Sequence, residues 1–189
     1  TYQGLPEDGF TPFFNSLIDS NNIEIKLNCD FFAEKGNLNF DQLIYTGPLD
    51  QYFNYQFGEL QWRGIELSKE HVSYPSSFET AVCNFPSKDV QKTRTHIPRH
   101  LYPLRKYQAK SELLIHEKSI DGKIAPFYPI RLESQMDILK SYEDLKAKEA
   151  SVYFGGRLAS YAYLDMDQVI AQALNLSKLI IKKASNSRG

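Results

Sequence analysis

The chain has 189 residues, of which 42% are hydrophobic and 24% charged, and this ordinary globular composition is enough to bury one sizeable core. Its 22 Lys and Arg residues are balanced by 23 Asp and Glu residues, so it has no basic field to bind nucleic acid or an anionic membrane. No apolar run approaches the ~20 residues of a membrane span, and no charged-then-apolar leader is visible, which indicates a cytoplasmic protein.

The first fifty residues predict a helix followed by two strands. Thr11 can cap the first helical turn, Pro12 suits the first helical position, and apolar residues continue at helical spacing to Ile18. Residues 23–29 alternate between apolar and polar, which predicts a half-buried strand at the start of an antiparallel sheet. Residues 41–50 predict a further strand that ends in the Gly47-Pro48 turn.

The rest of the chain predicts more strands and then two helices. Between residues 60 and 118, four runs rich in β-branched and aromatic residues are separated by turn-forming residues: LQWRGIEL, TAVCNF, KTRTHI and ELLIHE. Successive strands with few helices between them favour antiparallel order. Apolar stripes predict helices over residues 133–148 and from residue 166 onward. The predicted fold class is therefore α+β.

A glycine-containing turn lies between the two predicted helices. The segment SVYFGGRL is a short β-prone run that leads to Gly155, Gly156 and Arg157, an arrangement that can bring backbone close to an anion or cofactor. A GGR turn alone is weak evidence and an ordinary αL turn is favoured; no complete GxGxxG fingerprint and no Walker loop is found in the sequence. Asp165 can cap the last helix, with Gln168 closing a pair that resembles a capping box.

Three further residues carry candidate chemistry, each with a structural alternative. Arg94 can clamp a diphosphate with two donors, or it can be an ordinary surface arginine. Tyr128 lies between two prolines that stiffen its backbone, so its hydroxyl can be presented to a ligand or can pack. Glu117 is adjacent to His116, but neighbouring residues of a strand face opposite sides, which argues against an acid–base pair.

The sequence predicts no metal site and no disulfide. The histidines other than His116 have no spacing typical of metal ligands: His71, His96 and His100. Cys29 and Cys83 fit neither a disulfide-rich scaffold nor a ligand pair, so each is predicted to be a buried free thiol in a reducing compartment.

Several segments, in their order, resemble the UDP-galactopyranose mutase family: YTGPLDQYFNYQFGELQWR, NF followed by a TR dipeptide, PFYPI, and FGGRLASYAYLDMDQVIAQAL. The resemblance runs over nearly the full chain and includes the opening YQGLPEDGFTPFF. It implies an α+β fold in which residues 1–150 form a substrate-binding region, mainly an antiparallel sheet with flanking helices. Residues 151–189 would return as the C-terminal strand and helix of an FAD-binding Rossmann-like domain.

The resemblance also implies the chemistry. Members of this family bind FAD and interconvert UDP-galactopyranose and UDP-galactofuranose for bacterial surface polysaccharides, through an adduct between the sugar and N5 of the reduced flavin. UDP-galactose is the implied partner, without nucleic acid or a membrane span. A homo-oligomer is possible, because we expect an apolar patch around the last helix.

The site residues are carried over position by position, and they include no metal ligand. Arg94 would hold the diphosphate and, with Glu117, belong to the catalytic residues. The substrate-binding residues would be Tyr2, Asn84, Arg94, Tyr128 and Tyr163, and the cofactor-binding residues would be Gly156, Arg157, Asp165 and Met166.

Two departures from the family pattern matter. The glycine-rich FAD fingerprint, the uridine-binding helices and a second arginine would lie upstream of Thr1, so this polypeptide alone is expected to be inactive. Where the family continues TRxxEHK, this chain reads TRTHIPRH, which places Ile97 and Pro98 at the acid and histidine positions and Arg99 at the lysine position. Pro98 removes a ladder hydrogen bond, so the backbone near Arg94 is expected to differ.

Two alternatives stay open at this point. One is an FAD-dependent oxidoreductase similar to the amine oxidases, because related FAD folds share a C-terminal GGR-type segment. The other is a non-catalytic relative that binds a nucleotide sugar but has lost the chemistry at the altered TRTHIPRH segment.

Overall fold

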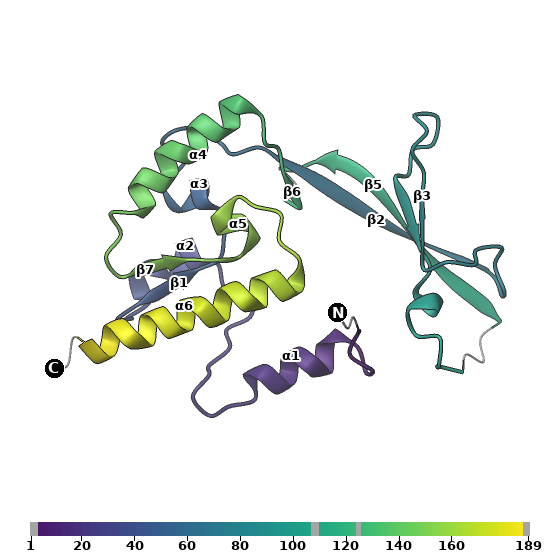
Figure 1. Cartoon of the computed structure of the whole chain (residues 1–189), viewed down its shortest axis with the longest axis horizontal. Coiled ribbons are helices and arrows are strands. Elements are labelled where there is room, and N and C mark those ends of the chain that lie inside the picture. Colours follow the sequence, from purple (N-terminus) through teal and green to yellow (C-terminus); the bar gives the residue numbers. More distant parts are fainter. Residues whose placement is uncertain (1–3, 107–109, 124–125, 187–189) are drawn as a thin grey trace. The chain divides into compact units, whose positions relative to one another are not determined.

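The computed structural model describes residues 4–106, 110–123 and 126–186, and it divides the chain into two compact units (Figure 1). The first unit comprises Thr1–Asn39 and Leu67–Lys118, and the second comprises Phe40–Glu66 and Ser119–Gly189. Both units contain helices and strands, which confirms the α+β class. The division predicted at residue 150 stays a prediction.

The N-terminal part of the first unit contains helices. Helix α1 (Phe10–Ile18) begins after Gly9, whose φ of 84° only glycine adopts readily, so the predicted Thr11 cap is wrong because Thr11 already lies inside the helix. Helix α2 (Phe31–Glu34) begins after Asp30, whose carboxylate accepts hydrogen bonds from two backbone N–H groups, and the 3₁₀ helix η1 (Lys35–Asn37) follows.

The strand predicted over residues 23–29 is not formed, and this prediction was wrong. Residues 24–28 have an extended or irregular backbone without strand pairing, and Leu27 is 81% exposed. Alternation of apolar and polar residues makes a strand only where a neighbouring strand and a packed face are available. Cys29 is likewise exposed rather than buried, and Cys83 is partly buried.

An antiparallel sheet with the order β3-β4-β5-β2-β6 contains all four runs predicted between residues 60 and 118 (Figure 1). Its strands are β2 (Trp62–Ser73), β3 (Val82–Asn84), β4 (Arg94–His96), β5 (Ser111–Asp121) and β6 (Tyr128–Pro129). In the first unit, Arg94 lies opposite Asn84 on one side and Glu117 on the other. This register places three predicted site residues in one row.

Pro98 ends strand β4, as its chemistry predicts. The 3₁₀ helix η2 (Pro98–Leu101) begins at this proline, which has no N–H to continue the ladder. Just before it, the Ile97 N–H donates to the Ala81 carbonyl at 2.8 Å, and the Ile97 side chain is fully buried. The TRTHIPRH segment is therefore a short strand followed by a tight turn.

In the second unit, two short strands from distant parts of the sequence pair in parallel. Strand β1 (Leu43–Tyr45) lies beside β7 (Val152–Phe154), so the predicted strand over 41–50 is present but pairs in parallel. The helices of this unit are α3 (Leu49–Tyr52), α4 (Glu133–Lys146), α5 (Gly156–Ser160) and α6 (Met166–Asn186). Figure 1 shows the long α6 running alongside β1 and β7. Both predicted C-terminal helices are thus confirmed.

Half of the buried core residues of the second unit come from the TGPLD-to-WR segment. Its buried cluster comprises Leu49, Leu60, Trp62, Leu139, Tyr142 and Tyr161. The two tyrosines keep their hydroxyls bonded inside this cluster: Tyr142 donates to the Gly58 carbonyl at 2.8 Å, and the Tyr161 hydroxyl lies 2.6 Å from the Gln61 carbonyl. Burial raises the pKa of both phenols.

Asp50 is the buried acid of the same segment. Burial raises its pKa, although its carboxylate accepts hydrogen bonds from the Leu60 and Gln51 N–H groups at 2.8 and 3.0 Å. These bonds tie the start of α3 to the residues just before β2, so the side chain serves the fold of this segment.

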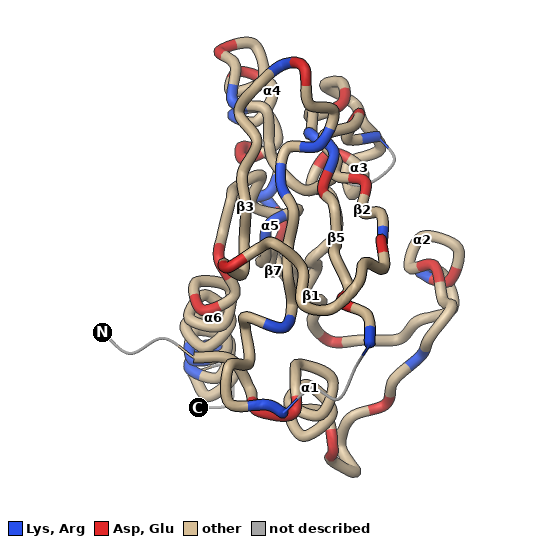
Figure 2. Tube along the Cα trace, turned by 90° about the vertical axis from the view of Figure 1, so that its right-hand side faces the viewer, with Lys and Arg blue, Asp and Glu red and all other residues tan. Residues whose placement is uncertain are grey.

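The surface of α6 carries the exposed apolar side chains that the sequence predicts. None of its residues from Met166 to Asn186 is buried, and five large apolar ones are exposed: Met166, Ile170, Leu174, Leu179 and Ile181. Self-association through them stays a prediction. Figure 2 shows acidic and basic residues interspersed along the chain, in keeping with the balanced charge.

Candidate functional site

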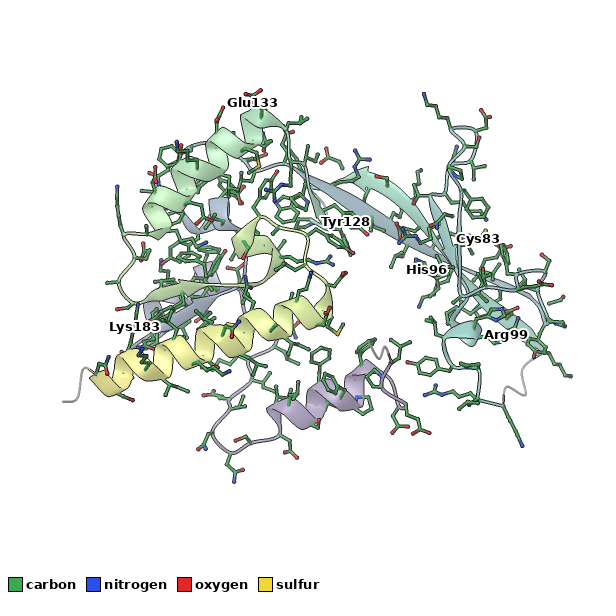
Figure 3. The ribbon with its side chains drawn as sticks, in the orientation of Figure 1. Cys83, His96, Arg99, Tyr128, Glu133 and Lys183 are labelled. Carbon is green, nitrogen blue, oxygen red and sulfur yellow. The ribbon has the colours of Figure 1, made fainter. Side chains whose placement is uncertain are left out.

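The first unit brings four polar side chains together across β3, β4 and β5, and we call Asn84, Arg94, His96 and Glu117 the Arg94 cluster. Arg94 and His96 are two residues apart on β4, so both side chains lie on the same face of the sheet. Figure 3 labels His96 on this strand, with Cys83 on the neighbouring β3. Three members of the cluster were predicted site residues.

Arg94 is held from two sides while staying accessible. Its Nε donates to Asn84 Oδ1 at 2.9 Å, and its Nη1 lies 3.7 Å from Glu117 Oε2. The Arg94 side chain is 39% exposed. A guanidinium has five N–H donors, and here Nε is engaged by Asn84. The arrangement orients a cation whose side chain stays partly exposed.

Glu117 provides the negative charge of the cluster. Its side chain is 12% exposed, and its Oε2 lies 3.2 Å from His96 Nε2. The Thr93 hydroxyl donates to the Glu117 carbonyl at 3.1 Å. A buried carboxylate with several polar partners fixes the orientation of the groups around it.

His116 belongs to a different cluster, as the alternation of strand residues predicts. Its Nε2 lies 2.7 Å from Glu70 Oε2, and its Nδ1 lies 2.9 Å from the Thr95 hydroxyl. Thr95 is opposite His116 in the register, on the face away from Arg94. An acid–base pair of His116 and Glu117 is therefore not formed.

The residue at the family's lysine position, Arg99, forms an ion pair with the buried Glu112. Its Nε donates to Glu112 Oε1 at 2.5 Å, and the Ser76 N–H donates to Glu112 Oε2 at 2.8 Å. Burial alone would raise the pKa of Glu112, but the hydrogen bonds from Arg99 and Ser76 outweigh it and lower the pKa to about 2. Arg99 therefore contributes to the fold of this segment.

The second unit contains another group of predicted site residues, and we call Tyr128, Tyr163 and Arg157 the Tyr163 stack. The Tyr128 and Tyr163 rings are stacked with centroids 5.5 Å apart, and the Arg157 guanidinium lies 4.5 Å from the Tyr163 centroid. Arg157 Nε also donates to the Leu164 carbonyl at 2.5 Å. Contact with the ring and with a carbonyl restrains the guanidinium from two directions.

Asp165 connects the stack to the first turn of α6. It accepts a hydrogen bond from the Tyr163 hydroxyl at 3.0 Å, and this bond, together with partial burial, raises the pKa of Tyr163. The Gln168 side chain accepts from the Asp165 N–H at 2.8 Å, which is one half of the predicted capping box. Met166, the first residue of α6, is exposed beside it.

Gly156 begins α5 shortly after β7, with a φ of 79° that favours glycine. Its N–H donates to Gln172 Oε1 of α6 at 2.6 Å. That N–H already donates to Gln172. Gly156 can therefore favour cofactor binding through the space left by its missing side chain.

The predicted site residues therefore fall into the Arg94 cluster of the first unit and the Tyr163 stack with its neighbours in the second unit. Tyr2 lies outside the described residues. Sequence reasoning assigns His96 no role and does not single out Gln172. The position of His96, two residues from Arg94 on a strand, is the signal that could have identified it.

A surface cavity of about 780 Å³ in the second unit is separate from these residues. It is lined by polar and apolar side chains, among them Asp50, Glu59, Trp62 and Lys123. None of the predicted site residues that the structure describes lines it. Among the described residues, no group of three or more His, Cys, Asp or Glu side chains is arranged to hold a metal ion.

Comparison with known proteins decides the family. The family model described as UDP-galactopyranose mutase matches residues 1–163, which is most of the chain. The chain belongs to the UDP-galactopyranose mutase family. The sequence resemblance to this family is thereby confirmed.

Individual mutases show the same relationship. A probable UDP-galactopyranose mutase of Klebsiella pneumoniae is 31% identical over 186 residues, which cover 98% of this chain and 48% of the relative. A dTDP-fucopyranose mutase of Escherichia coli is 30% identical over 96% of this chain and 49% of its own length. A UDP-galactopyranose mutase of Mycoplasma pneumoniae is 28% identical over 96% of this chain and 49% of its own length.

The chain spans about half the length of the curated mutases that it matches. Two of these mutases, with nearly equal identity to this chain, are named for different nucleotide sugars. Within the part of the chain that the structure describes, no helix is both long and apolar enough to cross a membrane.

Proposed function

We propose that the full-length protein is a cytoplasmic, flavin-dependent mutase that interconverts the pyranose and furanose forms of UDP-galactose, for bacterial surface polysaccharide. The observation that carries this proposal is the Arg94 cluster, in which a member of the mutase family holds an accessible guanidinium in a fixed orientation. A planar guanidinium matches the oxygens of a diphosphate better than an ammonium does, because it can donate two parallel hydrogen bonds.

Arg94 is proposed to bind the diphosphate of the nucleotide sugar. Asn84 accepts from Nε and so fixes the plane of the guanidinium, while Glu117 restrains the Nη1 side at 3.7 Å. The longer distance to Glu117 matters, since a weakly held nitrogen can turn to a phosphate oxygen at little cost. Glu117 is proposed to act by orienting Arg94 beside the substrate.

Tyr128 and Tyr163 are proposed as further hydrogen-bond donors to the nucleotide sugar. Their stacked rings, with Arg157 over Tyr163, fix the direction of both phenol groups. The Tyr163 hydroxyl donates to Asp165, so binding of a phosphate through this hydroxyl exchanges one anionic acceptor for another. Tyr2 is proposed as an additional substrate residue on the resemblance alone.

The residues of the second unit fit part of a flavin site. Gly156 has no side chain, and a Cβ added there meets nothing closer than Thr46 Cβ at 3.8 Å, so a cofactor can approach the backbone. Arg157 brings a cation, and the first turn of the 21-residue helix α6 presents Met166 to solvent. We therefore propose that Gly156, Arg157, Asp165 and Met166 contact FAD, and that β7 and α6 belong to its Rossmann-like domain.

The reduced flavin would supply the nucleophilic chemistry at the anomeric carbon of the sugar when it is bound. The residues of this chain bind and orient. Arg94 neutralises negative charge on the diphosphate, which stabilises it as a leaving group, and Asn84 and Glu117 hold Arg94 in place.

A second candidate substrate is a dTDP-linked sugar. The relative named dTDP-fucopyranose mutase is almost as similar to this chain as the probable UDP-galactopyranose mutase is. Both substrates contain a diphosphate, so the Arg94 cluster fits either one. The two candidates differ in the nucleobase, in the pentose (ribose in UDP, 2′-deoxyribose in dTDP) and in the sugar that is isomerised.

The test is a turnover assay on the full-length gene product with its flavin reduced. UDP-galactofuranose and dTDP-fucofuranose are supplied separately, and pyranose products are separated by chromatography, with the oxidised protein as the matched control. Product formed only with reduced flavin supports the mutase, and the preferred substrate identifies the nucleotide. Turnover that consumes an external electron acceptor would instead show an oxidoreductase, and binding without turnover would show a non-catalytic relative.

A further inference from the structure

We propose that His96 is a positioning residue that acts through Glu117. It controls how strongly Glu117 offsets the positive charge of Arg94, and therefore how tightly Arg94 binds an anionic ligand. This inference rests on the proposed function, because the ligand in question is the diphosphate of a nucleotide sugar. His96 lies at one of the two variable positions of the TRxxEHK pattern, so the family pattern assigns it no role.

The geometry gives His96 and Arg94 a common partner. Glu117 Oε2 lies 3.2 Å from His96 Nε2 and 3.7 Å from Arg94 Nη1. A carboxylate oxygen only accepts hydrogen bonds, so Nε2 of His96 must be the donor. The same oxygen therefore accepts a hydrogen bond from His96 and forms a longer ion pair with Arg94.

Two charged groups face His96, one on its own strand and one on a neighbouring strand. Its side chain shares a face of the sheet with Arg94 on its own strand, β4, and with Glu117 on β5. Its direct neighbours in the register are Val82 on β3 and Ile115 on β5, and neither can titrate. The charge state of His96 therefore acts on a cluster that otherwise holds one positive and one negative group.

Protonation of His96 changes the balance of this cluster. With His96 neutral, the charges of Arg94 and Glu117 cancel, and the guanidinium is offset by the carboxylate. With His96 protonated, its positive charge pairs with Glu117 at the shorter distance, and the cluster carries a net charge of about +1 by Coulomb additivity. An anionic ligand at Arg94 then binds more tightly.

The experiment measures the Kd of UDP-galactose for the full-length flavoprotein by calorimetry, roughly between pH 5.5 and 8, the range in which a histidine titrates. Each phosphate of a nucleotide sugar is a diester-like group without a second acidic proton, so the ligand charge stays constant over this range. For the wild-type protein we expect affinity to rise about threefold to tenfold as the pH falls, the size expected for one added charge near the surface.

Two substitutions separate charge from hydrogen bonding. His96→Gln keeps a donor to Glu117 without a titratable charge, so its affinity should match wild type at the upper end of the pH range and stay flat as the pH falls. His96→Lys carries a permanent charge, so its affinity at the upper end should equal that of wild type at the lower end. His71→Gln is the matched control and should keep the wild-type slope, because His71 is an exposed residue of β2, which β5 separates from β4.

Each outcome supports the inference or overturns it. If both His96 variants keep the wild-type slope while the protein binds UDP-galactose, the inference is wrong and the proposed function stands. If neither UDP-galactose nor dTDP-fucose binds at any pH, the proposed function fails and the inference fails with it. Thermal melting curves of all variants show whether the fold is retained, and either His96 variant that folds decides the question.

Discussion

Two arginine–glutamate pairs of the first unit take their glutamates from strand β5, and they differ in distance and in exposure to solvent. Both carboxylates, Glu112 and Glu117, come from β5, and both arginines, Arg94 and Arg99, come from the TRTHIPRH segment. The Arg99–Glu112 distance is 2.5 Å and the Glu112 side chain is 2% exposed. The Arg94–Glu117 distance is 3.7 Å, and both side chains are more exposed.

The difference shows that one short segment can contain an arginine that stabilises the fold and another that is available to bind a ligand. A tight, buried pair uses its guanidinium on the protein, and removal of one partner leaves an uncompensated buried charge. A loose, partly exposed pair contributes little to stability, and its guanidinium can turn to a ligand at small cost. We therefore expect Arg99 variants to affect folding and Arg94 variants to affect binding.

The largest effect is expected for Arg94→Leu. Loss of charge-assisted hydrogen bonds to a diphosphate should lower kcat/KM for the nucleotide sugar by about 10²- to 10³-fold. The free energy of unfolding should change by less than about 1 kcal/mol, because Arg94 is 39% exposed and lies 3.7 Å from Glu117, which keeps its contact with His96. Steady-state kinetics and urea unfolding of the same full-length preparation measure both quantities.

The matched control for that prediction is Lys69→Ala, which removes an exposed positive charge from β2. It should leave kcat/KM within about twofold of wild type, as expected for a screened surface charge. A loss of stability in Arg94→Leu as large as its loss of activity would contradict the assignment of Arg94 to binding.

The next effect in size is the destabilisation expected for Arg99→Leu. Glu112 would be left buried with Ser76 as its remaining donor, at an expected cost of about 3 kcal/mol. The double variant Arg99→Leu with Glu112→Leu should recover part of that loss, since it removes the uncompensated charge as well. Urea unfolding curves of the three proteins give the comparison, and an unchanged midpoint in Arg99→Leu would show that the pair contributes nothing.

A third prediction concerns pH. The pKa of Glu112 in the folded protein is about 2, against an ordinary value of 4.5, so the charged form is stabilised by folding. This contribution is fully present above pH 4.5 and is lost as the pH falls toward 2. The difference in unfolding free energy between wild type and Glu112→Gln should therefore shrink as the pH falls from about 4.5 toward 2, which urea unfolding at several pH values measures.

The fold of the sheet could largely be predicted from the sequence because its strands are bounded by strong local signals. Pro98 ends β4 where its missing N–H requires, and the alternation on β5 places His116 and Glu117 on opposite faces. The strand over residues 23–29 could not be excluded in this way. Its alternating pattern is genuine, but pairing depends on a partner strand, which is a property of the tertiary structure.

The candidate site, like the fold, could be predicted from the sequence only in part. Arg94 can be identified from its chemistry and from the TR dipeptide, and the register of β3, β4 and β5 then explains Asn84 and Glu117. The Tyr163 stack could not be derived from local pattern, because β6 and the residues before α6 are distant in the sequence. The parallel pairing of β1 with β7 escaped prediction for the same reason.

The smallest effect is expected for Asn84→Ala, which removes a hydrogen-bond acceptor from Arg94. Without Asn84 Oδ1, Arg94 Nε loses its 2.9 Å acceptor, and within the part of the chain that the structure describes Glu117 remains to restrain the guanidinium. Loss of one neutral acceptor to a charged donor should lower kcat/KM by about tenfold, less than loss of the arginine itself. Steady-state kinetics of the full-length enzyme measure the change.

The matched control is Asn84→Asp, which keeps an acceptor for Arg94 Nε at the same position but adds a negative charge beside the guanidinium. If Asn84 only orients Arg94, the aspartate variant retains activity close to wild type, because its carboxylate can accept the same hydrogen bond. If the net charge of the cluster governs binding, the aspartate variant loses more affinity than Asn84→Ala does, because two carboxylates then compete with the diphosphate for one guanidinium. The loose Arg94–Glu117 pair predicts that Asn84→Asp loses more affinity than Asn84→Ala. The guanidinium can leave Glu117 for a ligand, but a second carboxylate at position 84 would hold it in place.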